Sequence, residues 1–272
     1  IEAVAKVQYA IGDILHEKKQ FSLSNYGVPT VPMASDVISS IRMAIELVQQ
    51  AIRQAEVSMN FRIGVDVSLF AHAVTNEDTG ALIGYTAPNG TIFSGVDLVE
   101  SYATLWRSHP LYAIEDPFHP QDSVAYRTLK MKIESVVRDS ASQLTPIGGD
   151  SKCLLEVVGD TLIHTREDVD RYVDEAFINT TLLRIEKHKT VTSCITCSKK
   201  CRSVGWSVII GCSELTYDSP DSFMVDLAIG MNARRLRIGG IDSAQCSTKL
   251  NRLLQVQQDA PDIQFVFDSF RY

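Results

Sequence analysis

The sequence predicts an α/β fold in which a parallel sheet curls into a (β/α) barrel of the TIM type. Short apolar runs alternate with amphipathic helical stretches along the 272 residues, as parallel strands joined by helices do. Six of these runs fit the barrel repeat, and they begin near residues 62, 111, 154, 181, 207 and 235. A closed barrel needs eight strands. We therefore expect two strands to precede residue 1, or the sheet to be open.

The first third of the chain predicts two helices before the first strand. Residues 1–15 carry apolar side chains at helical spacing, whereas Gly and two Pro in residues 21–35 forbid a helix there. A second helix is predicted from residue 35 to residue 54, with Ser35 or Asp36 as its N-cap. After the first strand, the glycines of residues 74–95 indicate a loop or small hairpin.

The rest of the chain supplies one helix after each of the six strands. The predicted helices cover residues 96–109, 124–139, 165–177, 190–204, 219–233 and 247–261. Residues 138–152 are expected to be an insertion on the surface.

The amino-acid composition indicates which classes of protein the chain could belong to. The chain is 45% hydrophobic and 22% charged, with a net charge of −7, which is typical of a soluble globular domain. No basic cluster indicates a nucleic-acid partner. No apolar run reaches the roughly 18 residues that span a membrane.

Three of the six cysteines, Cys194, Cys197 and Cys201, form a C-x₂-C-x₃-C pattern. Such spacing can hold zinc or support redox chemistry. The segment is predicted to be helical, however, so the three thiols share one face, which favours packing in the core. We expect reduced thiols and an intracellular protein.

Acidic side chains end three successive apolar runs. Asp66, Glu115 and Asp160 follow FRIGV, LYAI and LLEVVG. The carboxyl ends of parallel barrel strands meet on one face, where barrel enzymes carry their chemistry. Three converging carboxylates suit Mg²⁺. The competing interpretation is that each carboxylate caps a strand or pairs with a neighbouring Arg or Lys.

Several motifs together resemble the barrel domain of enolase. They are IEDPF at 114–118, VGDTL at 158–162, TLLRI at 181–185, GWSV at 205–208, RLRIGG at 235–240 and FDSF at 267–270. The resemblance covers residues 1–270. It implies that residues 1–272 form the C-terminal barrel domain of a longer protein, whose N-terminal capping domain and first barrel strands lie outside this chain.

The resemblance also implies an activity. Enolases dehydrate 2-phosphoglycerate to phosphoenolpyruvate in glycolysis and act as dimers. Asp66, Glu115 and Asp160 match the family's Mg²⁺ ligands. Mg²⁺ is therefore the expected cofactor, and a phosphorylated three-carbon acid is the expected substrate of this lyase chemistry.

The departures from the family pattern fall on proton-transfer and substrate-binding groups. Arg184 stands in place of the family's lysine base and Arg237 in place of its second lysine. Arginine is a poor proton acceptor but binds phosphate and carboxylate well. The family's S-H-R-S-G motif aligns with residues 211–216, where Ser213 is a candidate substrate ligand, and Gly27 matches the acid/base glutamate.

Two interpretations of the arginines stay open. Arg184 and Arg237 either hold substrate anions or form buried salt bridges to the same carboxylates, replacing the cation. His119, His188 and Lys187 are alternative bases by chemistry, but each histidine is more typical of an ordinary loop residue.

Two functions follow. One is an enolase-type lyase with degenerate catalytic residues, and the other is a catalytically impaired pseudoenzyme serving as an interaction component of a larger assembly. The changed residues resemble those of the divergent sperm-flagellar branch of the family. This resemblance implies a cytoplasmic protein of a flagellum or cilium with axonemal partners.

Overall fold

The structure, a computed structural model, describes residues 1–19, 22–23, 29–57, 61–140, 155–174, 178–212, 221–241 and 243–262. Two long helices open it, α1 (Glu2–Glu17) and α2 (Val37–Gln54), and they pack side by side. Between them lies a short antiparallel pair, β1 (Ser22–Leu23) and β2 (Pro29–Thr30). Asp36 caps α2, as expected, by accepting the Ser39 N–H at 2.8 Å.

A six-stranded parallel sheet forms the centre. In spatial order its strands are β11 (Arg235–Arg237), β10 (Ser207–Gly211), β9 (Thr180–Arg184), β8 (Glu156–Gly159), β7 (Leu111–Glu115) and β3 (Ile63–Asp66). Every neighbouring pair is parallel. All six predicted strands are present, and the predicted (β/α) class is confirmed.

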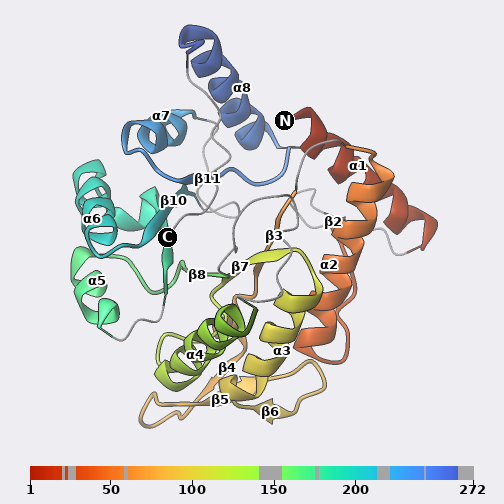
Figure 1. The fold of residues 1–272 in the computed structure, drawn as a ribbon, viewed down its shortest axis with the longest axis vertical. Helices are drawn as coiled ribbons and strands as arrows, with labels where there is room; N and C mark the ends of the chain where they lie inside the picture. Colours follow the sequence, from red (N-terminus) through yellow and green to blue (C-terminus); the bar gives the residue numbers. More distant parts are fainter. Residues whose placement is uncertain are drawn as a thin grey trace.

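The helices lie around the outside of this sheet (Figure 1). They are α3 (Gly95–Ser108), α4 (Ser123–Ser140), α5 (Arg166–Val173), α6 (Val191–Ser203), α7 (Phe223–Gly230) and α8 (Ala244–Asp259). The large core fills the space between sheet and helices. A second cluster of Ala113, Val158, Leu182 and Ile209 lies on the other face, one residue from each of four strands.

The sheet is curled, as the contact between side chains of its two edge strands shows. Arg237 on β11 donates to Asp66 on β3, 171 positions away, at 3.2 Å. The outer ring also comes together: the Ile241 N–H donates to Gln8 of α1 at 3.2 Å, and the N-terminus lies beside α8 in Figure 1.

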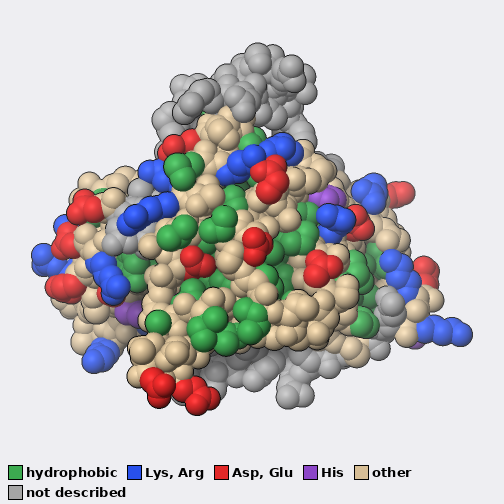
Figure 2. Space-filling view, turned by 90° about the horizontal axis from the view of Figure 1, so that it is seen from below, with side chains coloured by type: hydrophobic (Ala, Val, Ile, Leu, Met, Phe, Trp, Pro, Cys, Tyr) green, Lys and Arg blue, Asp and Glu red, His purple; other side chains and the backbone are tan. Residues whose placement is uncertain are grey.

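Residues 73–93 form more structure than the loop or hairpin expected. They fold into a three-stranded antiparallel sheet of β4 (Ala73–Thr75), β5 (Leu82–Thr86) and β6 (Ile92–Phe93). The buried Tyr85 hydroxyl fixes this sheet by donating to Asp122 at 3.0 Å and accepting the His119 N–H at 2.8 Å. Figure 2 looks onto this side of the molecule, where hydrophobic and acidic side chains are interspersed.

The cysteine-bearing segment is the helix α6, and it packs in the core as predicted. Cys194, Cys197 and Cys201 are free thiols, each at most 1% exposed. Cys153 and most of the predicted surface insertion lie outside the described residues. Among the helices that the structure describes, none is long and apolar enough to cross a bilayer.

Candidate functional site

The candidate site lies at the carboxyl ends of the central strands. Asp66 ends β3 and pairs in register with Glu115, which ends the adjacent β7. Asp160 directly follows β8, the next strand along the sheet. The three carboxylates therefore share one end of the sheet, as their positions in the sequence predict.

Arg237 joins two of these carboxylates from the last strand. Its Nη1 donates to Glu115 Oε1 at 2.5 Å and its Nη2 donates to Asp66 Oδ2 at 3.2 Å. The Asp66 side chain is about a third exposed, whereas that of Glu115 is 13% exposed. A single guanidinium thus joins the two edge strands of the sheet, β11 and β3.

Arg184 and Lys187 hold the third carboxylate. Arg184 binds Asp160 through both of its oxygens, with Nε–Oδ1 at 2.8 Å and Nη2–Oδ2 at 2.5 Å. Lys187 Nζ lies 3.3 Å from Oδ1 and 3.4 Å from the Asp160 carbonyl oxygen. Such two-point pairing is the strong mode of arginine–carboxylate binding, and it engages both side-chain oxygens of Asp160.

Gly211 makes room for Arg237 and for the core residue Leu182. It ends β10 and lies in register with Arg184 on one side and Arg237 on the other. A Cβ at this position would lie 2.9 Å from a Leu182 methyl carbon and 3.2 Å from Arg237 Cβ. The missing side chain therefore lets two guanidinium-bearing strands flank β10 closely.

Asp116 has a structural role in this corner. Its backbone is left-handed, with φ +42°, and its buried carboxylate accepts the N–H groups of Asp160 at 3.0 Å and Thr161 at 3.2 Å. Burial raises its pKa to about 6, although these hydrogen bonds oppose the rise. Asp116 thereby fixes the turn that carries Asp160.

The electrostatics of Glu115 reflect its neighbours. Burial is the largest cause of a pKa raised to about 7; Arg237 acts to lower it, and the charges of Asp66, Asp160 and Asp116 add to the rise. Near neutral pH this group is therefore close to changing its charge.

The partners of these three carboxylates decide whether they can hold the expected Mg²⁺. Carboxylates of this kind suit Mg²⁺, but here Asp66 and Glu115 are engaged by Arg237, and Asp160 by Arg184 and Lys187. Within the described residues, no three His, Cys, Asp or Glu side chains are grouped so that they could hold a metal ion. In this arrangement the residues do not fit Mg²⁺.

A second ion pair lies on the same face of the sheet. Glu156 and Arg235 precede Asp160 and Arg237 by four and two positions, and they form a two-point pair, with Glu156 wholly buried. The Arg235 guanidinium also stacks over Tyr112 at 5.1 Å. This pair was not predicted from the sequence. Its signal is the even spacing, because alternate residues of a strand share a face.

The remaining residues singled out from the sequence are His119, His188, Ser213 and Gly27. His119 Nδ1 accepts the Gln121 N–H at 3.2 Å in the turn after β7. The interpretation of His188 as an ordinary loop residue is wrong, because the residue is 2% exposed and neither ring nitrogen has a hydrogen-bond partner within the described part of the chain. Ser213 and Gly27 lie outside the described residues.

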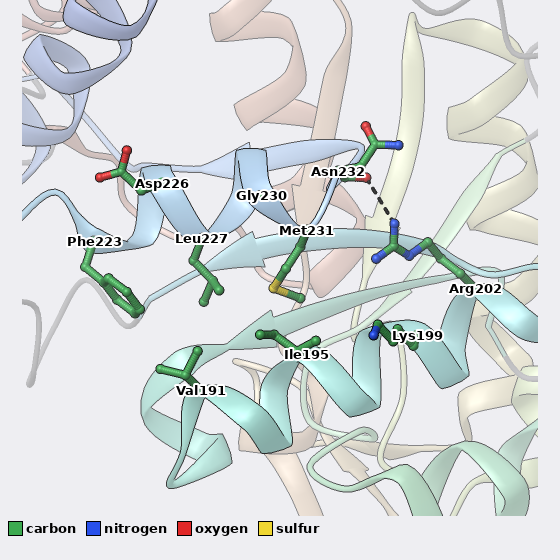
Figure 3. Close-up of a pocket in the computed structure, with 10 residues that line it drawn as sticks. All are labelled: Val191, Ile195, Lys199, Arg202, Phe223, Asp226, Leu227, Gly230, Met231 and Asn232. Carbon is green, nitrogen blue, oxygen red and sulfur yellow. Dashed lines mark hydrogen bonds between the residues drawn. The ribbon is translucent and has the colours of Figure 1, made fainter.

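A groove of about 650 Å³ lies on the outer ring between α6 and α7. Figure 3 shows Val191 and Ile195 of α6 facing Phe223 and Leu227 of α7, with Lys199 toward one end. It belongs to the outer ring of helices, whereas the carboxylates lie at the ends of the strands.

Comparison with known proteins identifies the lineage. Residues 5–267 match the enolase C-terminal TIM barrel domain family. The chain is 26% identical to cytosolic enolase 3 of Arabidopsis thaliana over 231 residues, which are 83% of this chain and 43% of that protein. It is 22% identical to the enolase of Methanopyrus kandleri over 262 residues, 95% of this chain and 55% of that protein. For enolase 1 of Entamoeba histolytica the identity is 24% over 239 residues, 86% of this chain and 50% of that protein.

The chain thus spans about half the length of the curated relatives it matches. The matched family also agrees with the curled parallel sheet and its outer helices. From its match over residues 5–267, the chain belongs to the enolase C-terminal TIM barrel domain family.

Proposed function

We propose that this chain is the barrel of an enolase-lineage pseudoenzyme, in which ion pairs hold the former catalytic cluster and the barrel serves as a component of a larger assembly. The observation that carries the proposal is the two-point pair of Arg184 with Asp160. On the resemblance to enolases, Arg184 stands where the family has its lysine base.

The chemistry of Arg184 supports the loss of proton transfer. A base must accept a proton, and a guanidinium stays protonated throughout the physiological range. Burial disfavours the Arg184 cation, but its hydrogen bonds and ion pair with Asp160 outweigh burial and raise its pKa above the ordinary value. The group is therefore both charged and held in place.

The alternative is a retained enolase reaction, and the presence of an amine, that of Lys187, at the carboxylate cluster favours it. An amine there could take over as base. Mg²⁺ held by Asp66, Glu115 and Asp160 would supply positive charge to the developing dianion of 2-phosphoglycerate. Arg184, Ser213 and Arg237 would then hold the substrate's anionic groups.

An assay of the full-length protein separates the two. Phosphoenolpyruvate formation from 2-phosphoglycerate is followed with Mg²⁺ present, beside an active enolase as positive control. We expect no turnover above background. Turnover that disappears in the Asp160→Asn variant would overturn the proposal. Arg184→Lys tests whether the missing base is the limiting defect, and we expect little rescue because other groups are also changed.

The setting is part of the same proposal. We place the protein in the cytoplasm of a flagellum or cilium, as a homodimer with axonemal partners; the support is the resemblance of its changed residues to the sperm-flagellar branch. Immunostaining of flagellated cells should label the axoneme, and light scattering of the purified protein should give twice the chain mass. Diffuse staining of the cell body would contradict this location.

A further inference from the structure

We infer that the guanidinium groups of Arg237 and Arg184 take the place of a metal cation in the carboxylate cluster, so that removing Arg237 opens a divalent-cation site at Asp66 and Glu115. The inference deepens the proposed function and rests on it, since it explains how the cluster persists without catalysis. It concerns what neutralises the carboxylates, which a turnover assay does not measure.

Charge pairing is the first argument. Among the described residues, Asp66, Glu115 and Asp160 are in contact with three cations, those of Arg184, Arg237 and Lys187. Each of these carboxylates therefore already has a cationic partner without any added ion. A divalent cation entering the cluster would lie close to fixed positive charges at low effective dielectric, where like charges repel strongly. The arginines therefore exclude the ion that they replace.

Geometry is the second argument. Arg237 presents two different nitrogens to two different carboxylates, Nη1 to Glu115 and Nη2 to Asp66. Its guanidinium thus lies between the Glu115 and Asp66 carboxylates. A metal ion shared by these two carboxylates would lie in the same place. Truncating Arg237 leaves the Asp66 and Glu115 carboxylates facing one space without the guanidinium that joins them.

The replacement also depends on the strand between the arginines. Gly211 has no side chain, and an added Cβ would come within 3.2 Å of Arg237 Cβ. Arg237 and Arg184 reach their carboxylates from either side of this position. The glycine at position 211 therefore leaves the space in which Arg237 can reach Glu115 and Asp66.

The test is Mn²⁺ binding to the full-length protein, followed by the loss of the free-ion signal in electron paramagnetic resonance. The wild-type protein should show no saturable site at these carboxylates. The Arg237→Ala variant should gain one, with affinity at least tenfold above any wild-type binding. Mg²⁺ should compete for it and should raise the melting temperature of the variant but not of the wild type.

The chain offers matched controls. Arg235→Ala removes an arginine that pairs with the Glu156 carboxylate and does not join Asp66 to Glu115, so no cation site should appear at Asp66 and Glu115. Adding Asp66→Asn to Arg237→Ala should abolish the gained site. If Arg237→Ala does not fold, Arg237→Gln keeps most of the side-chain volume and is measured in the same way.

The outcomes are distinct from those of the enolase assay. Saturable Mn²⁺ binding to the wild type that is lost in Asp160→Asn overturns the inference even if no turnover occurs. Absence of a gained site in both folded Arg237 variants also overturns it. Turnover of 2-phosphoglycerate by a wild-type protein without such a metal site would overturn the proposed function alone.

Discussion

The ion pairs of Arg237 and Arg235, two positions apart on β11, differ in the number of carboxylates that each arginine joins and in how deeply those carboxylates are buried. At the strand ends, Arg237 serves two carboxylates, and the side chains of Arg237 and Asp66 remain about a third exposed. Further along the same face, Arg235 serves one carboxylate that is wholly buried. Both sets come from alternate positions of the same strands, β8 and β11 in particular.

This difference separates two uses of a charge inside a barrel. Breaking the Glu156–Arg235 pair leaves one isolated charge, which can only be protonated or disrupt the fold. Breaking the cluster at the strand ends leaves several carboxylates together, which another cation can serve. The first arrangement contributes only to the fold, whereas the second retains the elements of a site.

The largest effect is expected from Arg235→Met. Glu156, at 0% exposure, would lose its cation, so the free energy of unfolding should fall by about 3–5 kcal/mol. Urea unfolding measures this loss. The double variant Glu156→Gln with Arg235→Met should recover most of it, because no buried charge remains. Equal losses in both variants would show that packing over Tyr112, and not charge, is what matters.

Asp116→Ala tests the turn that carries Asp160. The change leaves the N–H groups of Asp160 and Thr161 without their acceptor and places Ala at φ +42°. Together these should cost about 2–3 kcal/mol. Asp116→Asn keeps an acceptor and tolerates the left-handed backbone, so chemical denaturation should show a much smaller change. Equal losses would contradict this role.

His188 should make stability depend on pH. Burial lowers its pKa, assisted by the charges of His164 and Lys187 and opposed by Asp168. The unfolded chain therefore binds more protons than the folded one below the unfolded pKa of about 6.5. Wild-type stability should fall as pH decreases from 6.5.

The control for this prediction is His188→Phe, which removes the titrating group. Melting curves of the two proteins from pH 7.5 to 5 should diverge below pH 6.5, with the wild type losing more. Parallel curves would show that His188 does not titrate in this range.

The smallest effect is expected for an exposed pair. Arg252 binds Asp226 through three contacts of 2.8–3.2 Å, but both side chains are about a third exposed or more. Arg252→Met should therefore change stability only slightly, and far less than Arg235→Met does, because solvent screens an exposed ion pair. A loss as large as that of Arg235→Met would mean that burial does not set the cost of breaking these pairs.

Much of this fold can be predicted from the spacing of apolar residues and from the polar residues that begin and end each element. The apolar runs locate all six parallel strands, and the acidic residues after three of them locate one end of the sheet. Asp36 and Thr165 show why helix starts are predictable, since each caps its helix through local hydrogen bonds. These features depend on neighbours within a few positions along the chain.

The pairing inside the barrel is not predictable in this way. The sequence left open whether Arg184 and Arg237 hold substrate or carboxylates, because Arg237 meets Asp66 and Glu115 across 171 and 122 positions. His188 was misread for a similar reason. A histidine soon after a strand looks like a loop residue in the sequence, but here the 3₁₀ helix Ile185–His188 places the His188 ring in the core.

The contact from Arg237 to Asp66 has a consequence for local opening. It ties the first strand of the described sheet to the last, so neither edge can detach without breaking the same ion pair. Backbone amides of Ile63–Asp66 and Arg235–Arg237 should then exchange with deuterium in one cooperative event. In an ordinary open sheet, the two margins would fray independently; here a guanidinium makes them a single unit.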